Sequence, residues 1–183
     1  MLSRIFALTI VIVLSPVYLL IYILIFIEDG TDVIFSQKRP GKNHKLFNLY
    51  KFRTMKLDTP EVATHLLENP SQYLLRIGWF LRKFSLDELP NLINVVKGDI
   101  GFVGPRPALY NQDDLISLRE KYGIDKLRPG ITGWAQINGR DEISIEEKVQ
   151  LEKYYLDHKS FYFDIKILFL TFKYALLGKG VSH

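Results

Sequence analysis

The 183-residue chain has the length of one ordinary domain, and 48% of its residues are hydrophobic. It contains no cysteine, which excludes a disulfide framework and a thiolate metal site, and its four histidines lack the spacing of a zinc site. The formal net charge of +4 is compatible with a surface that meets phosphates, but it does not distinguish anionic lipid, nucleotide and nucleic acid.

An uncharged segment opens the chain. Ile5 to Ile27 carries no charged residue, and a straight helix of that length would cross a hydrocarbon core of ~30 Å. The segment is longer than the apolar part of a signal peptide, and Glu28-Asp29 follows it in place of a cleavage site. Ser15-Pro16 interrupts it, and proline bends or breaks a helix. The pattern allows a kinked spanning helix or a helix-break-helix that enters and leaves by one face.

Behind this segment the chain becomes soluble in character, so we expect a membrane segment over residues 1–29 and a globular domain over residues 30–183. Strands are expected at Val33 to Phe35 and at Leu46 to Met55, joined by a Pro-Gly turn over residues 38–43. Alternation along the second strand would place Lys51 and Arg53 on one face, where two cations could bind a phosphate. A strand edge protected by charge is the alternative.

Helices are expected over most of the remaining chain, which predicts an α+β fold that is mainly helical. Two of them mix aromatic and apolar residues with basic ones, which is typical of helices at a membrane interface; a plain core helix is the alternative. These two are Tyr73 to Phe84 and Asp164 to Leu177. The others are Glu61 to Glu68, Pro90 to Lys97, Asn111 to Tyr122, and a helix to Asp157 that opens on the capping box of Ser144 and Glu147.

A pair of adjacent carboxylates, Asp87 and Glu88, lies where an apolar helix is expected to begin, and basic residues flank the pair on both sides. Free backbone N–H groups and the helix dipole favour anions at a helix start, so an ionised Asp87 and an approaching phosphate would both be stabilised there. Ser85 with Glu88 has the form of a capping box, which would make Glu88 structural. Pro90 instead favours a later helix start, because proline fits best at the first helical position.

An arginine held between two prolines, Arg106, is the second candidate. Pro105 and Pro107 restrict the local backbone to an extended conformation. A guanidinium held in this way is preorganised to bind a phosphate through two parallel hydrogen bonds. The sequence therefore predicts a phosphate-binding arginine after the acidic pair.

A glycine-rich loop is expected over residues 128–140. Its side chains could hold a nucleobase or a sugar, with Trp134 to stack, Gln136 and Asn138 to form hydrogen bonds, and Arg128 and Arg140 to supply charge. An ordinary structural loop is the alternative, and no residue of this set is decisive alone.

The motifs favour phosphoryl transfer over other chemistry. The chain has neither the P-loop pattern of ATPases nor the glycine fingerprint of dinucleotide-binding folds. Adjacent carboxylates on a helix point ~100° apart and do not easily face one another across a sugar, as glycoside hydrolysis requires. A carboxylate can instead attack phosphorus or hold Mg²⁺, while arginines neutralise charge on the transferring group.

Six motifs appear in an order that closely resembles the monotopic bacterial sugar transferases, the small PglC-like phosphoglycosyl transferases. The resemblance covers nearly the whole chain, and six motifs in order are highly specific although some are weak alone. They are Ser15-Pro16 in the apolar segment, Tyr50-Lys51-Phe52-Arg53-Thr54-Met55, Ser85-Leu86-Asp87-Glu88-Leu89-Pro90, Lys97-Gly98-Asp99, Gly104-Pro105-Arg106-Pro107 and Arg128-Pro129-Gly130-Ile131-Thr132-Gly133.

The resemblance implies that the protein transfers a sugar-1-phosphate from a UDP-sugar to undecaprenyl phosphate and releases UMP. This would be the first membrane step in assembling a capsule, O-antigen, exopolysaccharide or glycoprotein. It further implies that the Ser15-Pro16 break forms a re-entrant hairpin, so that the enzyme acts at the cytoplasmic face of the bacterial inner membrane. Its partners would be a UDP-sugar, undecaprenyl phosphate, an anionic bilayer and downstream glycosyltransferases. Nucleic acid would not be a partner.

The resemblance also assigns roles to individual residues. Asp87 would be the nucleophile that forms a covalent phosphosugar intermediate, and it would lie close to Mg²⁺. Glu88 would assist it, Arg106 would bind phosphate, and Arg82 and Lys51 match basic positions near the site. A membrane-bound phosphatase with the same acidic pair is an alternative. A non-catalytic scaffold is a further one, although a scaffold has no need of the acidic pair or Arg106.

Overall fold

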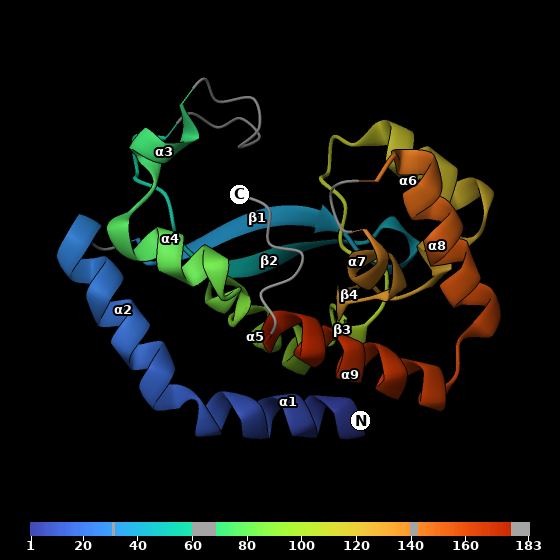
Figure 1. The fold of residues 1–183 in the computed structure, drawn as a ribbon, viewed down its shortest axis with the longest axis horizontal. Helices are drawn as coiled ribbons and strands as arrows, with labels where there is room; N and C mark the ends of the chain where they lie inside the picture. Colours follow the sequence, from blue (N-terminus) through green and yellow to red (C-terminus); the bar gives the residue numbers. More distant parts are fainter. Residues whose placement is uncertain (31, 60–68, 140–142, 177–183) are drawn as a thin grey trace.

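The computed structural model describes residues 1–30, 32–59, 69–139 and 143–176, which form a mainly helical α+β structure with a short β-hairpin (Figure 1). The fold class expected from the sequence is thereby confirmed. The helix expected at residues 61–68 and the candidate Arg140 lie outside the described residues. In chain order the elements are α1 (Leu2–Val13), α2 (Ser15–Asp29), β1 (Ile34–Pro40), η1 (Lys42–His44), β2 (Leu46–Phe52), α3 (Pro70–Tyr73), α4 (Arg76–Lys83), η3 (Leu86–Glu88), α5 (Asn91–Lys97), β3 (Gly101–Val103), α6 (Asp113–Lys121), η4 (Ile124–Lys126), β4 (Gly130–Thr132), α7 (Trp134–Asn138), α8 (Ile145–His158) and α9 (Phe161–Leu176).

The N-terminal apolar segment forms two helices, α1 and α2, bent by 59° where they meet at Leu14. Pro16 lies in the first turn of α2, where its missing N–H has no helical partner to lose. No single helix in the described part of the chain is long and apolar enough to cross a bilayer, whereas the bent pair together meets that length and composition. The break expected at Ser15-Pro16 is therefore present.

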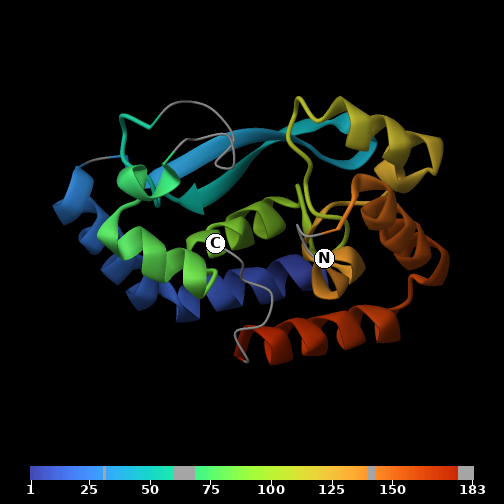
Figure 2. The same cartoon turned by 45° about the horizontal axis from the view of Figure 1, so that its top comes forward.

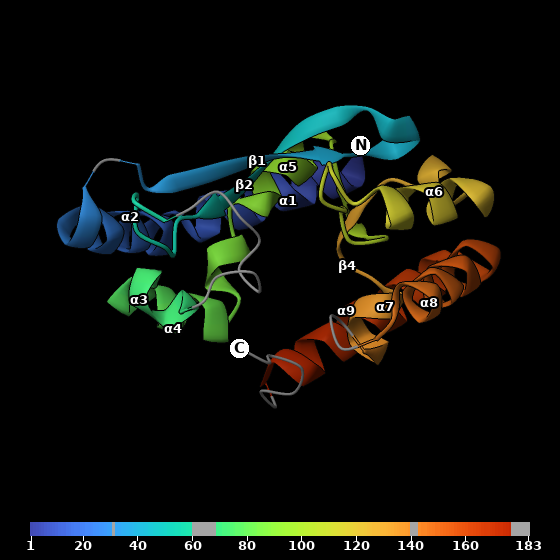
Figure 3. The same ribbon diagram turned by 90° about the horizontal axis from the view of Figure 1, so that it is seen from above.

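The two arms of this segment line the core on one side. Ala7 in α1 is fully buried with Leu92 and Val95 of α5, and Ile21 and Ile25 in α2 are buried with residues of β2 and α4. The opposite sides of both helices carry exposed apolar side chains, which are Phe6, Ile12, Leu20 and Phe26 among others. In Figures 1, 2 and 3, α2 lies at one end of the molecule and α6 and α8 lie at the other.

Two carboxylates at the end of α2 connect it to the rest of the fold. Glu28 accepts hydrogen bonds from the backbone N–H groups of Arg76 and Ile77 at 2.6 and 3.2 Å, which satisfies free donors in the first turn of α4. Asp29 forms an ion pair with Arg53, which is 6% exposed. The expectation that Arg53 shares a strand face with Lys51 is wrong, because β2 ends at Phe52 and Arg53 turns toward α2.

The hairpin pairs β1 with β2 in antiparallel register, from Ile34 opposite Phe52 to Pro40 opposite Leu46. Its first strand is longer than the expected Val33 to Phe35, and η1 closes the turn. Asn94 of α5 is fully buried, and its side chain forms two hydrogen bonds with the backbone of β2. Its Oδ1 accepts from the N–H of Tyr50 at 3.1 Å, and its Nδ2 donates to the carbonyl of Asn48 at 2.7 Å.

A second pair of strands was not expected from the sequence. β3 and β4 pair in parallel, with Gly101 opposite Gly130 and Val103 opposite Thr132, and β4 lies in the stretch predicted to be a loop. The backbones approach so closely that a Cβ on Gly104 would lie 2.3 Å from the carbonyl oxygen of Arg128. Strands of three residues carry too little alternation to be recognised by pattern.

The C-terminal half forms its own core of α6, η4, α8 and α9, around the buried side chains of Leu115, Ile124, Val149, Tyr155 and Ile167. The capping box of Ser144 and Glu147 is present, with both reciprocal hydrogen bonds formed. In α9, Ile165, Phe169 and Phe172 are exposed, as are Trp79 and Phe80 in α4. A plain core role is therefore wrong for these side chains, which point away from the core.

Asn94→Ala should lower the free energy of unfolding by about 1–3 kcal/mol for each buried backbone group it leaves unpaired. Thermal unfolding in detergent micelles measures the loss. Asn48→Ala is the matched control, because the Asn48 side chain is exposed and only its carbonyl takes part, so a change within about 0.5 kcal/mol is expected. Equal losses in both variants would contradict the role given to the Asn94 side chain.

Candidate active site

The acidic pair lies on the short 3₁₀ turn η3, between α4 and α5. Ser85 opens the turn in the left-handed region, with φ of 54°, and its side chain caps no helix. The capping box expected from Ser85 and Glu88 is therefore wrong, because the Glu88 carboxylate bonds to other elements. Pro90 is the N-cap of α5, so the later helix start is the one observed.

Glu88 is shared by two cations. Its Oε1 accepts from Lys51 Nζ at 2.8 Å and from Arg106 Nη2 at 2.7 Å. Burial raises the pKa of the Glu88 carboxyl, but the charges and hydrogen bonds of Arg106 and Lys51 outweigh it and hold this pKa well below its usual range. Glu88 therefore remains ionised and joins β2, η3 and the Pro-Arg-Pro segment.

Asp87 has a different environment although it is the next residue. It is 9% exposed, and its nearest cation is Lys51, whose Nζ lies 4.0 Å from Oδ2. Burial raises the pKa of Asp87 and the charge of Glu88 adds to this, which together outweigh the lowering by Lys51, Arg82 and Arg106. The two carboxylates are thus unequal: Glu88 holds cations in place, whereas Asp87 is the more basic of the two.

The remaining cation beside Asp87 is Arg82, from the last turn of α4. Its Nε donates to the Thr54 hydroxyl at 2.9 Å, and burial lowers the pKa of its guanidinium while the charge of Asp87 raises it. The structure thus brings together Lys51, Arg82 and Arg106 around the acidic pair, the arrangement that the family resemblance implied for Lys51 and Arg82.

The segment Pro105 to Pro107, here called the strap, is held by two arginines that the sequence analysis did not single out. Arg119 Nη2 donates to the Arg106 carbonyl at 2.9 Å, and Arg39 Nη1 donates to the Pro107 carbonyl at 3.3 Å. Arg119 is itself paired with Glu152, with Nε 2.7 Å from Oε2, and the two side chains are almost fully buried. Nothing in the sequence distinguishes this pair from polar residues on a helix surface.

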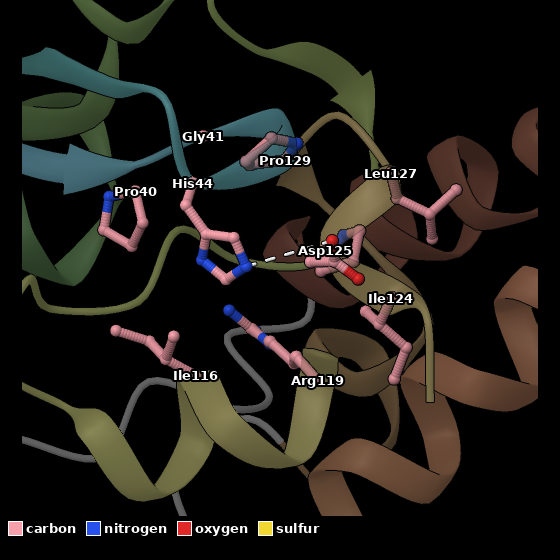
Figure 4. Close-up of a pocket in the computed structure, with 10 residues that line it drawn as sticks. Pro40, Gly41, His44, Ile116, Arg119, Ile124, Asp125, Leu127 and Pro129 are labelled. Atoms are coloured by element: carbon pink, nitrogen blue, oxygen red, sulfur yellow. Dashed lines mark ion pairs between the residues drawn. The ribbon is translucent and has the colours of Figure 1, made fainter. Parts of the chain in front are cut away.

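A hollow lies beside Glu88 and is lined by polar and apolar groups from both strand pairs. Its polar lining is Arg39, Lys51, Glu88, Asn91 and Arg106, and its apolar lining is Leu49, Ile100, Pro107, Gly130 and Ile131. A second hollow lies behind the strap, where Pro105 and Arg119 line it together with His44 and Asp125, whose Nε2 and Oδ2 atoms lie 3.9 Å apart (Figure 4). Glu88 lines the first hollow and neither carboxylate of the acidic pair lines the second, while Asp87 lines neither of them.

The glycine-rich region over residues 128–140 differs from the expected loop, since it contains β4 and α7. Trp134 is packed against Tyr154 and Phe163, with ring centroids 5.9 and 5.0 Å away, so its ring faces protein aromatics. Gln136 has both amide atoms buried without a hydrogen-bond partner in the described part of the chain, and Arg128 is exposed. The structure does not bring these residues to the acidic pair.

The acidic pair offers Mg²⁺ one carboxylate, Asp87, and no complete set of protein ligands among the described residues. Within the described residues, no three His, Cys, Asp or Glu side chains form a metal-binding group. Mg²⁺ in proteins is commonly held by one or two carboxylates together with substrate phosphates, and a dedicated cage is not needed. Asp87 fits that role, because Glu88 Oε1 is already engaged by two cations.

Comparison with known proteins gives the family. The model of the family described as bacterial sugar transferase matches residues 1–178. The chain belongs to the bacterial sugar transferase family. This transferase is 43% identical over its whole length, and over 91% of the relative, to an uncharacterized sugar transferase, EpsL, of Bacillus subtilis.

Two further relatives have names that state a reaction. The UDP-glucose:undecaprenyl-phosphate glucose-1-phosphate transferase of Escherichia coli is 40% identical over 93% of this sugar transferase and 38% of the relative. The undecaprenyl-phosphate galactose phosphotransferase of Salmonella typhimurium is 35% identical over 93% of the chain and 39% of the relative. The chain thus spans about two fifths of the length of these two proteins.

Glu152→Gln should destabilise this sugar transferase by about 3–5 kcal/mol, because it leaves the charge of Arg119 buried without its partner. Denaturant unfolding in detergent measures the loss. The matched control on the same helix is Asp157→Asn, which breaks the exposed Lys153–Asp157 pair and should change stability by no more than about 0.5 kcal/mol. Similar stabilities for the two variants would contradict the cost assigned to breaking the buried pair.

Proposed function

We propose that this sugar transferase moves a sugar-1-phosphate from a UDP-sugar to undecaprenyl phosphate and releases UMP. One observation carries the proposal: an acidic pair on a tight turn, with Asp87 as the more basic carboxylate and Lys51, Arg82 and Arg106 gathered around it. The printed names of the Escherichia coli and Salmonella relatives support the same substrate classes.

The chemistry follows from the difference between the two carboxylates. An Asp87 oxygen attacks the phosphorus that carries the sugar, the bond from that phosphorus to the bridging oxygen of the diphosphate breaks, and UMP leaves with the electron pair. A phosphate oxygen of undecaprenyl phosphate then attacks the same phosphorus, and the Asp87 carboxylate leaves. The product is the lipid-linked sugar diphosphate, and the enzyme returns to its starting form.

The basic residues act on charge in both steps. Negative charge grows on the phosphate oxygens in the transition state, and guanidinium and ammonium groups held in place beforehand stabilise it. Glu88 remains ionised next to Arg106 and Lys51, so its role is to position these cations. Asp87, together with substrate phosphates, would hold Mg²⁺, which would supply further positive charge when bound.

The membrane segment is proposed to be re-entrant, with the catalytic domain at the cytoplasmic face of a bacterial inner membrane. The bend at Leu14 and the outward apolar side chains of α1 and α2 support this arrangement. Exposed aromatic residues on α4 and α9 would lie at the surface of the bilayer. The negative charge of anionic lipids would attract the basic residues of the chain to the same surface. The Tyr18 hydroxyl of α2 donates to the Leu89 carbonyl at 2.5 Å, so the membrane segment contacts the peptide next to Glu88. Glycosyltransferases that use the lipid-linked product are the proposed further partners.

Purified protein with Mg²⁺, undecaprenyl phosphate and its UDP-sugar should release UMP, and Asp87→Asn should lower the rate at least about 10³-fold while the fold is kept. A coupled assay that distinguishes UMP from UDP measures both. Asp157→Asn, the same substitution at an exposed site, should retain the rate. Release of UDP would contradict the proposed reaction, and normal turnover of Asp87→Asn would contradict the nucleophile.

The same assay separates the other candidate functions. A hydrolase with the same acidic pair would release UMP and sugar phosphate without the lipid acceptor, whereas the proposed transferase forms the lipid-linked product only when undecaprenyl phosphate is present. A non-catalytic scaffold would release no nucleotide with any UDP-sugar.

The absence of native cysteine allows a clean test of the membrane arrangement. Leu2→Cys, at the start of the bent pair, and Asp32→Cys, just beyond its end at Asp29, should both be protected from a membrane-impermeant maleimide in intact cells. Both should react after the cells are permeabilised, which is the internal control. Labelling of only one position in intact cells would show that the segment spans the membrane.

A further inference from the structure

Arg39, near the end of β1, reaches the hollow beside Glu88 and has a donor without a partner. Its Nη2 donates to Gln37 Oε1 at 2.7 Å, and its Nη1 donates to the Pro107 carbonyl at the longer distance of 3.3 Å. Its Nε is buried and has no hydrogen-bond partner in the part of the chain that the structure describes. A buried donor left without a partner is costly, so a ligand oxygen that reached this N–H group would stabilise it.

The electrostatics of the hollow favour an anion. Burial lowers the pKa of Arg39 to about 10, with a further lowering by Arg106 that the charge of Glu88 partly offsets. Arg39 remains charged at neutral pH, and it faces a second guanidinium in a partly buried place. Among the residues that the structure describes, three cations, Arg39, Lys51 and Arg106, and one carboxylate, Glu88, line the hollow, so positive charge is in excess in this lining. An anion would relieve the repulsion between the two guanidiniums.

The strap brings the two guanidiniums to one place. Arg106 belongs to the strap, and Arg39 bonds to the carbonyl of the next residue, Pro107. Two arginines at one hollow can each present planar N–H donors to the oxygens of one phosphate, which is the geometry that guanidinium groups favour. Exposed Lys38, the preceding residue on β1, does not line this hollow.

We propose that Arg39 is a phosphate-binding residue that forms, together with Arg106, a two-guanidinium site for the phosphate of the sugar-phosphate group. The proposal rests on the proposed function for the identity of the substrate. Its structural basis is the shared hollow, the unpartnered Arg39 Nε and the excess of positive charge.

Asn91 indicates which phosphate occupies the site. This side chain is 4% exposed and lines the same hollow, and its Oδ1 is buried without a hydrogen-bond partner among the described residues. An acceptor requires a donor, which an ionised phosphate lacks and a sugar hydroxyl supplies. The apolar lining from Leu49, Ile100 and Ile131 suits the C–H groups of a sugar ring. A sugar phosphate supplies both a hydroxyl donor for Asn91 and C–H groups for the apolar lining. A polyprenyl phosphate supplies C–H groups but no hydroxyl donor.

The test compares Arg39→Gln with Lys38→Gln, which removes the same charge one residue away on β1. Steady-state rates of UMP release are measured against UDP-sugar and against undecaprenyl phosphate separately, with the thermal midpoint of each variant. We expect Arg39→Gln to raise the KM for UDP-sugar on the order of tenfold or more, which matches the loss of a charge-assisted hydrogen bond. We expect Arg39→Lys to recover part of the loss, and the KM for the lipid and all constants of Lys38→Gln to stay unchanged.

Two results would overturn the proposal. An unchanged KM for UDP-sugar in Arg39→Gln, with a lower kcat and a lower thermal midpoint, would show that Arg39 only braces the Pro107 carbonyl. A rise in KM for undecaprenyl phosphate alone would assign the phosphate to the lipid and would reject the sugar-phosphate assignment.

The proposal can also be separated from the proposed function. Calorimetric titration of wild-type protein, Arg39→Gln and Lys38→Gln with UDP-glucose and with inorganic pyrophosphate requires no turnover. Weaker binding in Arg39→Gln alone supports the anion site even where no UDP-sugar releases UMP, in which case only the proposed function fails. Equal binding by all three proteins rejects the anion site even where the wild-type protein turns over.

Discussion

The Glu88 carboxylate, shared by Lys51 and Arg106, is the interaction on which the site depends. A carboxylate at this depth is tolerated only with charged partners, because desolvation would otherwise favour its neutral form. Its partners come from β2 and from the strap, so η3 is fixed against two elements distant in sequence. At Asp87, the next residue, the nearby cations do not offset the effect of burial, so the pKa of its carboxyl stays raised. One ion cluster thus produces both the geometry of the site and the inequality of its carboxylates.

The strap depends in turn on the packing behind it. Arg119 donates to the Arg106 carbonyl while Glu152 on α8 neutralises its charge, and the close approach of β3 to β4 leaves no room for a side chain at Gly104. The C-terminal half therefore contributes to the geometry of the site although Asp87 and Glu88 both lie before it in the chain. Arg106 is held through its backbone as well as through its side chain.

The sequence predicted the features that local chemistry determines. The break at Ser15-Pro16, the hairpin and the capping box at Ser144 all follow from short-range rules. The family resemblance, and not a short-range rule, implied that Lys51 and Arg82 lie near the acidic pair. The rest depended on contacts distant in the chain. Arg53 and Trp134 have residue types suited to ligands, yet an ion pair with Asp29 and a cluster of aromatic rings engage them. Arg39 looked like an ordinary turn charge, because only the folded hairpin brings it to the strap.

The way α1 and α2 join the core limits how the protein can be simplified. Ala7, Ile21 and Ile25 are buried against later parts of the chain, Glu28 caps α4, and Asp29 neutralises Arg53. Removal of the first 29 residues would expose apolar surface of the core. It would also leave backbone N–H groups in the first turn of α4 without their acceptor and the buried guanidinium of Arg53 without its carboxylate partner. A water-soluble form for crystallisation or screening would therefore have to come from replacing outward-facing side chains of these helices, with the helices themselves retained.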